Sequence, residues 1–183
     1  MPYAPDVATE ACTECGFVWA DVPSAAVAER IRAATATLAD LLVGRPDAAA
    51  RRSAPDRWSP VEYGCHVRDV LLNLRDRIVL GAVEDTPVPH GMHGTPRVEL
   101  GLYALDDAAT TAADLRFAGG LFARTWSALP TDLVDRPIVY GWPVVATRDL
   151  RWVAAQALHE CEHHLADVRA DLGEEGRAPT TRR

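Results

Sequence analysis

Hydrophobic positions recur every three or four residues along four long stretches of the chain, which is the spacing of one face of an α-helix. The stretches are residues 24–44, 59–81, 106–129 and 149–172. Their boundaries carry residues that commonly begin or end helices, such as serine before the first turn and glycine after the last. No other part of the chain alternates hydrophobic and polar residues with comparable strength. The pattern therefore predicts an all-α protein, an antiparallel four-helix bundle.

Serine residues mark the beginnings of the first two helices. Ser24 precedes the first hydrophobic repeat and is expected to cap that helix, which stops at Gly44. Ser59 is followed by Pro60 at the first helical position and by Glu62 at the spacing of a capping box. This combination predicts that the second helix begins directly after Ser59.

The segments outside the helices differ in character. Residues 1–22 have no sustained period and are expected to form an extended leader, whereas residues 82–101 hold three prolines and three isolated glycines and predict a long loop. Residues 130–148 include short β-like runs but no convincing sheet. We therefore expect a leader, a bundle domain over 23–173 and a flexible tail over 174–183.

Composition and charge narrow the class of protein. Hydrophobic residues make up 48% and charged residues 25%, which is typical of a globular domain. A formal net charge of -7 argues against a surface that binds nucleic acid. No apolar run approaches the roughly 20 residues that span a bilayer, so we expect no membrane association and a cytoplasmic location. Four cysteines are too few for a disulfide scaffold in a chain of this size and are expected to remain thiols.

The fourth helical stretch contains the segment ALHECEHHLADV, residues 157–168, in which histidine and glutamate are concentrated. When each residue is advanced by about 100°, His164 lies roughly 60° and Glu160 roughly 100° from the centre of the hydrophobic stripe. His159 and His163 lie about 160° away, nearly opposite the predicted core. The spacing therefore separates a pair at the border of the core, Glu160 and His164, from a pair predicted to lie on the surface.

A histidine and a carboxylate one helical turn apart can bind the same cation, and Glu160 and His164 have this spacing. His66, on the second helix, also borders the core and supplies a third ligand. The predicted metal ligands are thus His66, Glu160 and His164, and Glu62 or Asp167 is the predicted catalytic group for moving a proton. The alternative is a structural His66 beside a solvated, histidine-rich helix surface.

Two sequence segments carry a family resemblance: WSPVEYGCHVRDV early and HECEHHLADV late. The chain resembles the DinB-like superfamily of four-helix metalloproteins, which includes mycothiol-dependent maleylpyruvate isomerase and thiol S-transferases, over about residues 24–172. The resemblance implies a metal ligand at His66. It also implies a pair on the last helix, matched either by Glu160 and His164, with Asp167 following, or by His159 and His163.

The resemblance further implies a bound divalent cation, zinc first, with nickel or another first-row ion as alternatives. It implies a small-molecule substrate, a low-molecular-weight thiol such as mycothiol as cofactor, and a homodimer. The expected activity is a thiol-dependent S-transferase or isomerase, and the alternatives are a metal-dependent hydrolase and a non-catalytic metal or small-molecule binding protein. Arg68, Arg97 and Arg148 are candidates for binding a carboxylate of thiol or substrate.

The leader contains the segment CTECGF, in which Cys12 and Cys15 have the spacing of half a zinc knuckle. The predicted loop supplies His90 and His93, which would complete a Cys2His2 site. The alternative is a pair of reduced cysteines without a metal. Cys161 is predicted to lie in the core by its helical phase.

Overall fold

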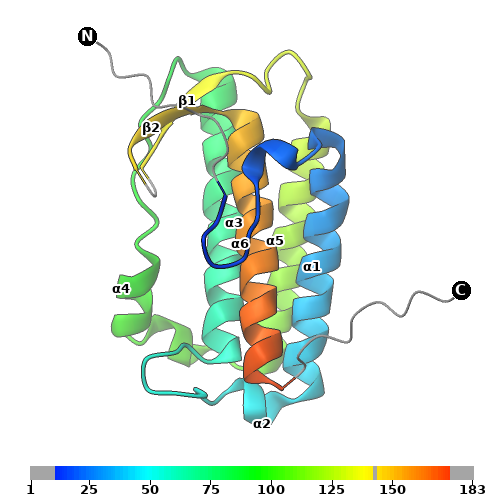
Figure 1. Cartoon of the computed structure of the whole chain (residues 1–183), viewed down its shortest axis with the longest axis vertical. Helices are drawn as coiled ribbons and strands as arrows, with labels where there is room; N and C mark the ends of the chain where they lie inside the picture. Colours follow the sequence, from blue (N-terminus) through cyan, green and yellow to red (C-terminus); the bar gives the residue numbers. More distant parts are fainter. Residues whose placement is uncertain (1–10, 142–143, 174–183) are drawn as a thin grey trace, which may run out of the picture.

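A computed structural model describes residues 11–141 and 144–173 of the chain. Four long helices pack side by side around one hydrophobic core (Figure 1). They correspond to the four periodic stretches of the sequence, so the four-helix bundle is confirmed. The helices are α1 (Ser24–Gly44), α3 (Pro60–Val83), α5 (Ala108–Ala128) and α6 (Leu150–Asp171).

The helices do not all run antiparallel to their neighbours. The α1–α5 pair is antiparallel, because Trp126 Nε1, at the end of α5, donates to the Ser24 carbonyl at the start of α1 (2.9 Å). The α3–α6 pair is antiparallel as well, since Gly81, near the end of α3, packs against Leu150 at the start of α6.

The α3–α5 pair is parallel, because Cys65 contacts Thr111 near the starts of both helices. The α1–α6 pair is parallel too, since Arg45, directly after α1, donates to the carbonyl of Leu172, directly after α6. Two consecutive helices can run the same way here because the connection between α3 and α5 passes along the length of the bundle (Figure 1).

The connections contain short elements that the periodicity did not predict. They are η1 (Trp19–Asp21), α2 (Pro46–Ala49), α4 (Gly94–Glu99), η2 (Leu102–Leu105), β1 (Pro137–Tyr140) and β2 (Ala146–Asp149). The two strands pair antiparallel, from Pro137 opposite Asp149 to Tyr140 opposite Ala146. The all-α prediction is therefore inexact, because strands of four residues are too short to give a clear alternation.

Side-chain caps fix where the long helices begin. The capping box predicted for α3 is confirmed: Ser59 Oγ accepts from the Glu62 amide (3.2 Å), and Glu62 Oε2 accepts from the Ser59 amide (2.7 Å). Asp149 caps α6 by accepting from the Trp152 amide (2.7 Å). Ser24 does not cap α1, since it is the first residue of the helix and Pro23 occupies the capping position.

The leader packs on the bundle and is not simply extended. Ala11 pairs with Val18 in an isolated β-bridge, and the intervening residues form a tight turn that lies beside α6 (Figure 1). Trp19 stacks on Trp152 of α6, with ring centroids 5.9 Å apart. Residues 11–22 therefore cover a face of α6 that helical phase alone assigns to solvent. The tail predicted over 174–183 lies outside the described residues.

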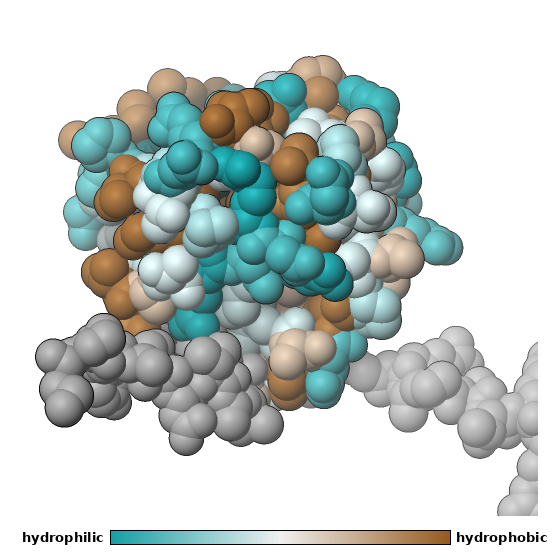
Figure 2. Space-filling view, turned by 90° about the horizontal axis from the view of Figure 1, so that it is seen from above, coloured by the Kyte–Doolittle hydropathy of each residue, from teal (hydrophilic) through white to brown (hydrophobic). Residues whose placement is uncertain are grey.

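Figure 2 shows the end of the bundle that carries β1 and β2. Hydrophilic residues extend across the middle of this end, and hydrophobic residues lie beside them. Hydrophobic and hydrophilic residues are thus interspersed on this end. Within the described parts of the chain, no helix is long and apolar enough to cross a bilayer.

Gly119 is a point of close approach between α5 and α1, and we expect Gly119→Ala to destabilise the fold by about 1–3 kcal/mol. A Cβ at this position would lie 3.0 Å from Thr35 Cβ, and Thr35 is buried with its hydroxyl donating to the Ile31 carbonyl (2.8 Å). The matched control is Gly120→Ala, where the nearest atom is the flexible Arg124 guanidinium, 3.3 Å away. Chemical denaturation should show Gly120→Ala at least as stable as the wild type, because alanine favours the helix. Equal stability of the two variants would contradict this account of the α1–α5 contact.

Candidate metal centre

Three side chains from α3 and α6 converge between these two helices. His66 Nε2 lies 3.3 Å from Glu160 Oε2, and His164 Nε2 lies 3.4 Å from the same oxygen. One ligand atom from each residue lies within 4.8 Å of the other two. The structure thus brings together His66, Glu160 and His164, the three residues that the sequence pattern selected.

The other oxygen of Glu160 is held away from the two histidines. Gln156, one turn earlier on α6, donates from Nε2 to Glu160 Oε1 (2.7 Å). Trp19 Nε1 donates in turn to Gln156 Oε1 (2.7 Å), and both residues of this bond are buried. A chain of hydrogen bonds from the leader therefore orients Glu160 so that Oε2 remains directed at the cluster. Gln156 was not among the predicted site residues, although its spacing of four residues from Glu160 is a usable signal.

His164 is oriented from its other ring nitrogen. Its Nδ1 lies 2.9 Å from Asp167 Oδ2, and a carboxylate in this position fixes the ring orientation of a metal-ligating histidine. Burial alone would lower the pKa of His164, but hydrogen bonds to Asp167 and Glu160 outweigh burial and raise that pKa to about 9. Burial alone would raise the pKa of Glu160, but hydrogen bonds from His164 and His66 hold it well below its usual range.

Glu160 is thus a carboxylate held between two imidazole nitrogens, and positive charge beside it stabilises its charged form. A proton can supply that charge, and so can a divalent cation bound by two imidazole nitrogens and a carboxylate oxygen. The donor set therefore fits the metal that the family resemblance implies. Three protein ligands leave at least one coordination position for another molecule, as catalytic sites require.

His66 is fixed by close packing. Its ring lies 5.2 Å from that of Trp58, and a Cβ added at Gly94 would lie 2.9 Å from His66 Nδ1. Glycine is thus required at position 94 for the connection between α3 and α5 to approach the imidazole this closely. The approach of Gly94 leaves His66 little freedom to rotate away from Glu160.

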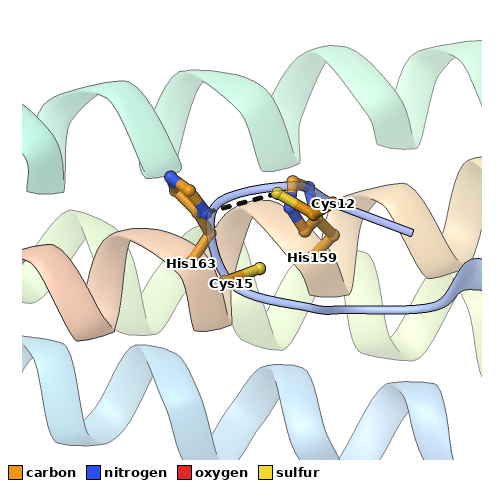
Figure 3. A group of neighbouring side chains, drawn as sticks. All are labelled: Cys12, Cys15, His159 and His163. Atoms are coloured by element: carbon orange, nitrogen blue, oxygen red, sulfur yellow. Dashed lines mark hydrogen bonds between the residues drawn. The ribbon is translucent and has the colours of Figure 1, made fainter.

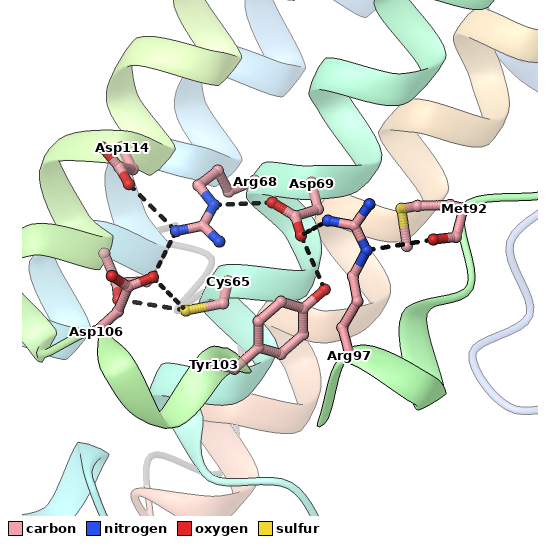
Figure 4. A network of polar contacts seen from close by, with 9 residues as sticks. Cys65, Arg68, Asp69, Met92, Arg97, Tyr103, Asp106 and Asp114 are labelled. Carbon is pink, nitrogen blue, oxygen red and sulfur yellow. Dashed lines mark hydrogen bonds and ion pairs between the residues drawn. The ribbon is translucent and has the colours of Figure 1, made fainter. Parts of the chain in front are cut away.

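An ionic network holds this connection against α3 (Figure 4). Arg97, in α4, donates to Asp69 of α3, and the Tyr103 hydroxyl donates to Asp69 Oδ2 (3.1 Å). Arg68 joins the same network and donates to three carboxylates, those of Asp69, Asp106 and Asp114. Arg68 and Arg97, which were candidates for binding a substrate carboxylate, are therefore paired within the protein. The third candidate, Arg148, is buried with its guanidinium 4.8 Å from the centre of the Trp152 ring.

A cavity of about 870 Å³ lies beside the cluster. This volume is within the usual range of small-molecule sites. Its walls come from the leader, α3, the connection before α4, the end of β1 and α6. Apolar and aromatic side chains provide much of the surface, among them Trp19, Trp58, Val70, Leu74, Met92 and Tyr140.

Arg77 is a cavity residue that sequence analysis did not identify. It is only 7% exposed, its Nη2 donates to the His90 carbonyl (2.7 Å), and its guanidinium lies 4.9 Å from the centre of the Tyr140 ring. Among the described residues no carboxylate pairs with Arg77, and its Nε has no hydrogen-bond partner. Burial lowers its pKa from the usual value of a guanidinium. The sequence held one signal for Arg77: its position next to Ile78 places a charged residue on the hydrophobic face of α3.

The two carboxylates expected to move protons have other partners. Glu62 is held by two bonds from Arg52 and by the amide of Ser59. Asp167 lies behind His164 and pairs with Arg57 (3.4 Å). Neither carboxylate lines the cavity, so this geometry gives no support to a proton-transfer role for either. Asp167 is a positioning residue for His164, and Glu62 is part of the α3 cap.

His159 and His163 differ from their predicted surface position. His159 is 3% exposed, because the leader covers it with Phe17 and Trp19, whose ring centroids lie 5.1 and 4.8 Å from its own. Burial lowers the pKa of His159 to about 4, so this ring is neutral at pH 7. His163 is partly buried beside it. The surface prediction for His159 is wrong because helical phase carries no information about a segment that packs from elsewhere in the chain.

Cys12 and Cys15 lie beside His159 and His163, and not with His90 and His93 as expected. Ligand atoms from the two cysteines and the two α6 histidines all lie within 4.8 Å of one another (Figure 3). The part of the chain that the structure describes therefore contains a second group of potential metal ligands, separate from the one at His66.

Comparison with known proteins places this architecture in a family. A model of the DinB superfamily matches residues 29–168. The chain belongs to the DinB superfamily. A solved structure, that of YfiT from Bacillus subtilis, resembles this DinB-superfamily chain with a TM-score of 0.73 and 16% sequence identity, covering 93% of this chain and 94% of that one. YfiT is described as a probable metal-dependent hydrolase with an unusual four-helix bundle topology. The comparison with curated proteins gave no match.

Proposed function

We propose that this DinB-superfamily chain is a divalent-metal-dependent enzyme that acts on a small molecule carrying an anionic group. The proposed ligands are His66, Glu160 and His164. The observation that carries the proposal is the convergence of their three donor atoms at the wall of a cavity of about 870 Å³. Zinc is the first choice of cation, although imidazole and carboxylate ligands also suit other first-row ions.

The residues around the cluster would each contribute to binding or positioning. A cation at this site would lower the pKa of a thiol or a water molecule that binds beside it. Gln156 holds Glu160, and Asp167 holds His164, so the ligand set is organised before substrate binds. The apolar walls would exclude bulk water, which strengthens electrostatic interactions inside the cavity.

We propose a low-molecular-weight thiol as the nucleophile, which makes the protein an S-transferase or isomerase. The cavity volume supports this choice, because it lies near the upper end of the range for single ligands and accommodates a thiol together with an electrophile. The family resemblance supports it as well, because Glu-x-x-x-His followed by x-x-Asp, matched by Glu160, His164 and Asp167, is the form found in the mycothiol-dependent maleylpyruvate isomerase branch. The second candidate is a hydrolase that uses water, which the description of YfiT favours.

A paired assay on the metal-loaded protein separates these functions. One arm follows conjugate formation between a low-molecular-weight thiol and a carboxylate-bearing electrophile, and the other follows cleavage of a carboxylate-bearing ester. Conjugation that needs both the metal and the protein supports the transferase. Ester cleavage that is indifferent to thiol supports the hydrolase instead. Metal retention with neither activity would favour a binding protein without turnover.

Arg77 is proposed to bind the anionic group of the substrate, and Arg77→Met should raise the KM for a carboxylate-bearing substrate roughly 30-fold or more. The physical reason is that a buried guanidinium with no carboxylate partner among residues 11–141 and 144–173 is available to pair with an anion. The matched control is Arg75→Met, since Arg75 donates to Thr125 and Asp76 and lies outside the cavity. Metal content should be unchanged in both variants. An equal KM for the two variants would contradict the role of Arg77.

A further inference from the structure

The turn of the leader lies against α6 with two cysteine side chains beside two histidine side chains (Figure 3). We infer that Cys12, Cys15, His159 and His163 form a second, structural zinc site that fastens the leader to the bundle. This site has four protein ligands and none in common with the cluster at His66. Two thiolates and two imidazoles are a donor set of closed, structural zinc sites.

The spacing of the donor atoms fits tetrahedral zinc. Ligand atoms around such an ion lie roughly 3.3–3.8 Å apart, given Zn–N and Zn–S distances near 2.0 and 2.3 Å. Cys12 Sγ lies 3.9 Å from His163 Nδ1, and all four donor atoms lie within 4.8 Å of one another. Small side-chain rotations therefore suffice to bring the four groups onto one ion.

The backbone of the leader is already folded to present both thiols. The Gly16 amide donates to the Cys12 carbonyl (2.8 Å), and the Cys12 amide donates to the Phe17 carbonyl (2.8 Å). Gly16 has a φ of 73°, a conformation that glycine adopts without strain. The turn thereby places Cys12 and Cys15 on the same α6 face as the two histidines.

His159 provides an independent observation that this site takes a ligand. The residue is 3% exposed, and neither of its ring nitrogens has a hydrogen-bond partner among the described residues. Leaving a buried polar group without a partner costs about 1–3 kcal/mol. A zinc ion bound at one of these nitrogens would offset that cost. The leader covers the imidazole with the rings of Phe17 and Trp19, and these contacts give its nitrogens no hydrogen bond.

The Asp167 carboxylate lies beside one histidine of each proposed metal site. Asp167 Oδ2 lies 2.9 Å from His164 Nδ1 and 3.6 Å from His163 Nε2. His163 thus directs Nδ1 toward Cys12, and His164 directs Nε2 toward Glu160. The other ring nitrogen of each histidine faces Asp167 Oδ2. Glu14 Oε2 also lies 3.4 Å from His163 Nε2. Carboxylates in this position orient histidine ligands and raise their basicity.

The proposed zinc site would also position one wall of the cavity beside His66. The turn that it fastens continues into Trp19, which donates to Gln156, and Gln156 donates to Glu160. This link to catalysis rests on the proposed function, whereas the zinc site itself does not. Zinc binding would release the thiol protons to solvent and would stabilise the folded leader by its binding free energy.

The test combines metal analysis with cobalt spectroscopy on the full chain purified under reducing conditions. Wild-type protein is expected to hold two zinc ions per chain. The double variant Cys12→Ser/Cys15→Ser should lose one, and His66→Ala should lose the other. Co²⁺ added to the metal-free protein should give sulfur-to-cobalt charge-transfer absorption in the wild type and in His66→Ala, and none in the double variant. Nitrogen and oxygen ligands do not produce this signature.

The matched control is Cys65→Ser, because Cys65 lies among polar partners, Asp106 and Thr111, outside both clusters. It should keep both metal ions and the cobalt–thiolate absorption. Should the double variant fail to fold, the spectrum of His66→Ala decides, because that variant lacks the other proposed metal site. Folded wild type without cobalt–thiolate absorption would overturn the inference, as would a Cys12–Cys15 disulfide in protein whose whole metal content depends on His66. Loss of metal from His66→Ala tests the proposed function separately.

Discussion

Replacing His66 with alanine is expected to remove the cation from the proposed site with Glu160 and His164 and to lower turnover on the order of 1,000-fold, because charge stabilisation by a bound cation is worth several kcal/mol. His66 is the single ligand that α3 supplies, and its Nε2 lies 3.3 Å from Glu160 Oε2. Without it, the remaining ligands are one carboxylate and one imidazole on the same helix. Mass spectrometry measures the loss of metal. The loss of turnover is measured in whichever assay, thiol conjugation or ester cleavage, the wild-type protein catalyses.

The control for this variant is His90→Ala, which removes an exposed histidine outside the cavity and keeps the carbonyl that accepts from Arg77. It should retain the metal and the turnover of the wild type. Circular dichroism establishes that His66→Ala remains helical. A folded His66→Ala protein with full metal content at this site would sink the proposed ligand set.

Asp167→Ala is expected to weaken metal binding about 10- to 100-fold without removing any ligand, because Asp167 orients the ring of His164. Burial alone would raise the pKa of Asp167, but its bond with His164 prevails and lowers that pKa, so the carboxylate is charged at neutral pH. Competition with a chelator of known affinity measures the change. If the second zinc site exists, its affinity should fall as well, since Asp167 Oδ2 also lies 3.6 Å from His163 Nε2.

Asp171→Ala is the matched control for this prediction. Asp171 accepts from Arg57 (2.9 Å), which also pairs with Asp167, but among the described residues no hydrogen bond or ion pair joins Asp171 to His163 or His164. A comparable loss of affinity in both variants would attribute the effect to the Arg57 ion pairs and not to the orientation of His164.

Helical phase was sufficient to predict that His66, Glu160 and His164 come together, because the geometry of an α-helix relates its side chains to a hydrophobic stripe. Glu160 and His164 lie one turn apart at the border of the α6 core face, and His66 lies at the border of the α3 core face. Two helices that pack along their stripes bring such borders together. The cluster follows from local periodicity together with a single packing contact.

The environment of His159 and the role of Arg77 depend on tertiary contacts that periodicity does not contain. His159 is buried by a leader that begins more than a hundred positions earlier in the chain. Arg77 interrupts a hydrophobic stripe, and only its place in the cavity distinguishes it from an arginine on a solvated face. The mixed parallel and antiparallel packing was likewise not predictable, because the stripe of a helix does not specify its direction.

The short elements were missed for a different reason. Strands β1 and β2 have four residues each, and α4 has six, so none extends over enough residues to establish a period. These short elements nevertheless supply residues that contact His66 or line the cavity. Gly94 begins α4 against His66, and Tyr140 ends β1 at the cavity wall.

The central claim is that His66, Glu160 and His164 bind a divalent cation beside the cavity. Anomalous diffraction at the zinc absorption edge, from crystals of the zinc-loaded wild-type protein, tests it most directly. The account predicts an anomalous peak within bonding distance of His66 Nε2, Glu160 Oε2 and His164 Nε2. Ordered density for these three side chains without such a peak, in protein that holds zinc elsewhere, would contradict it.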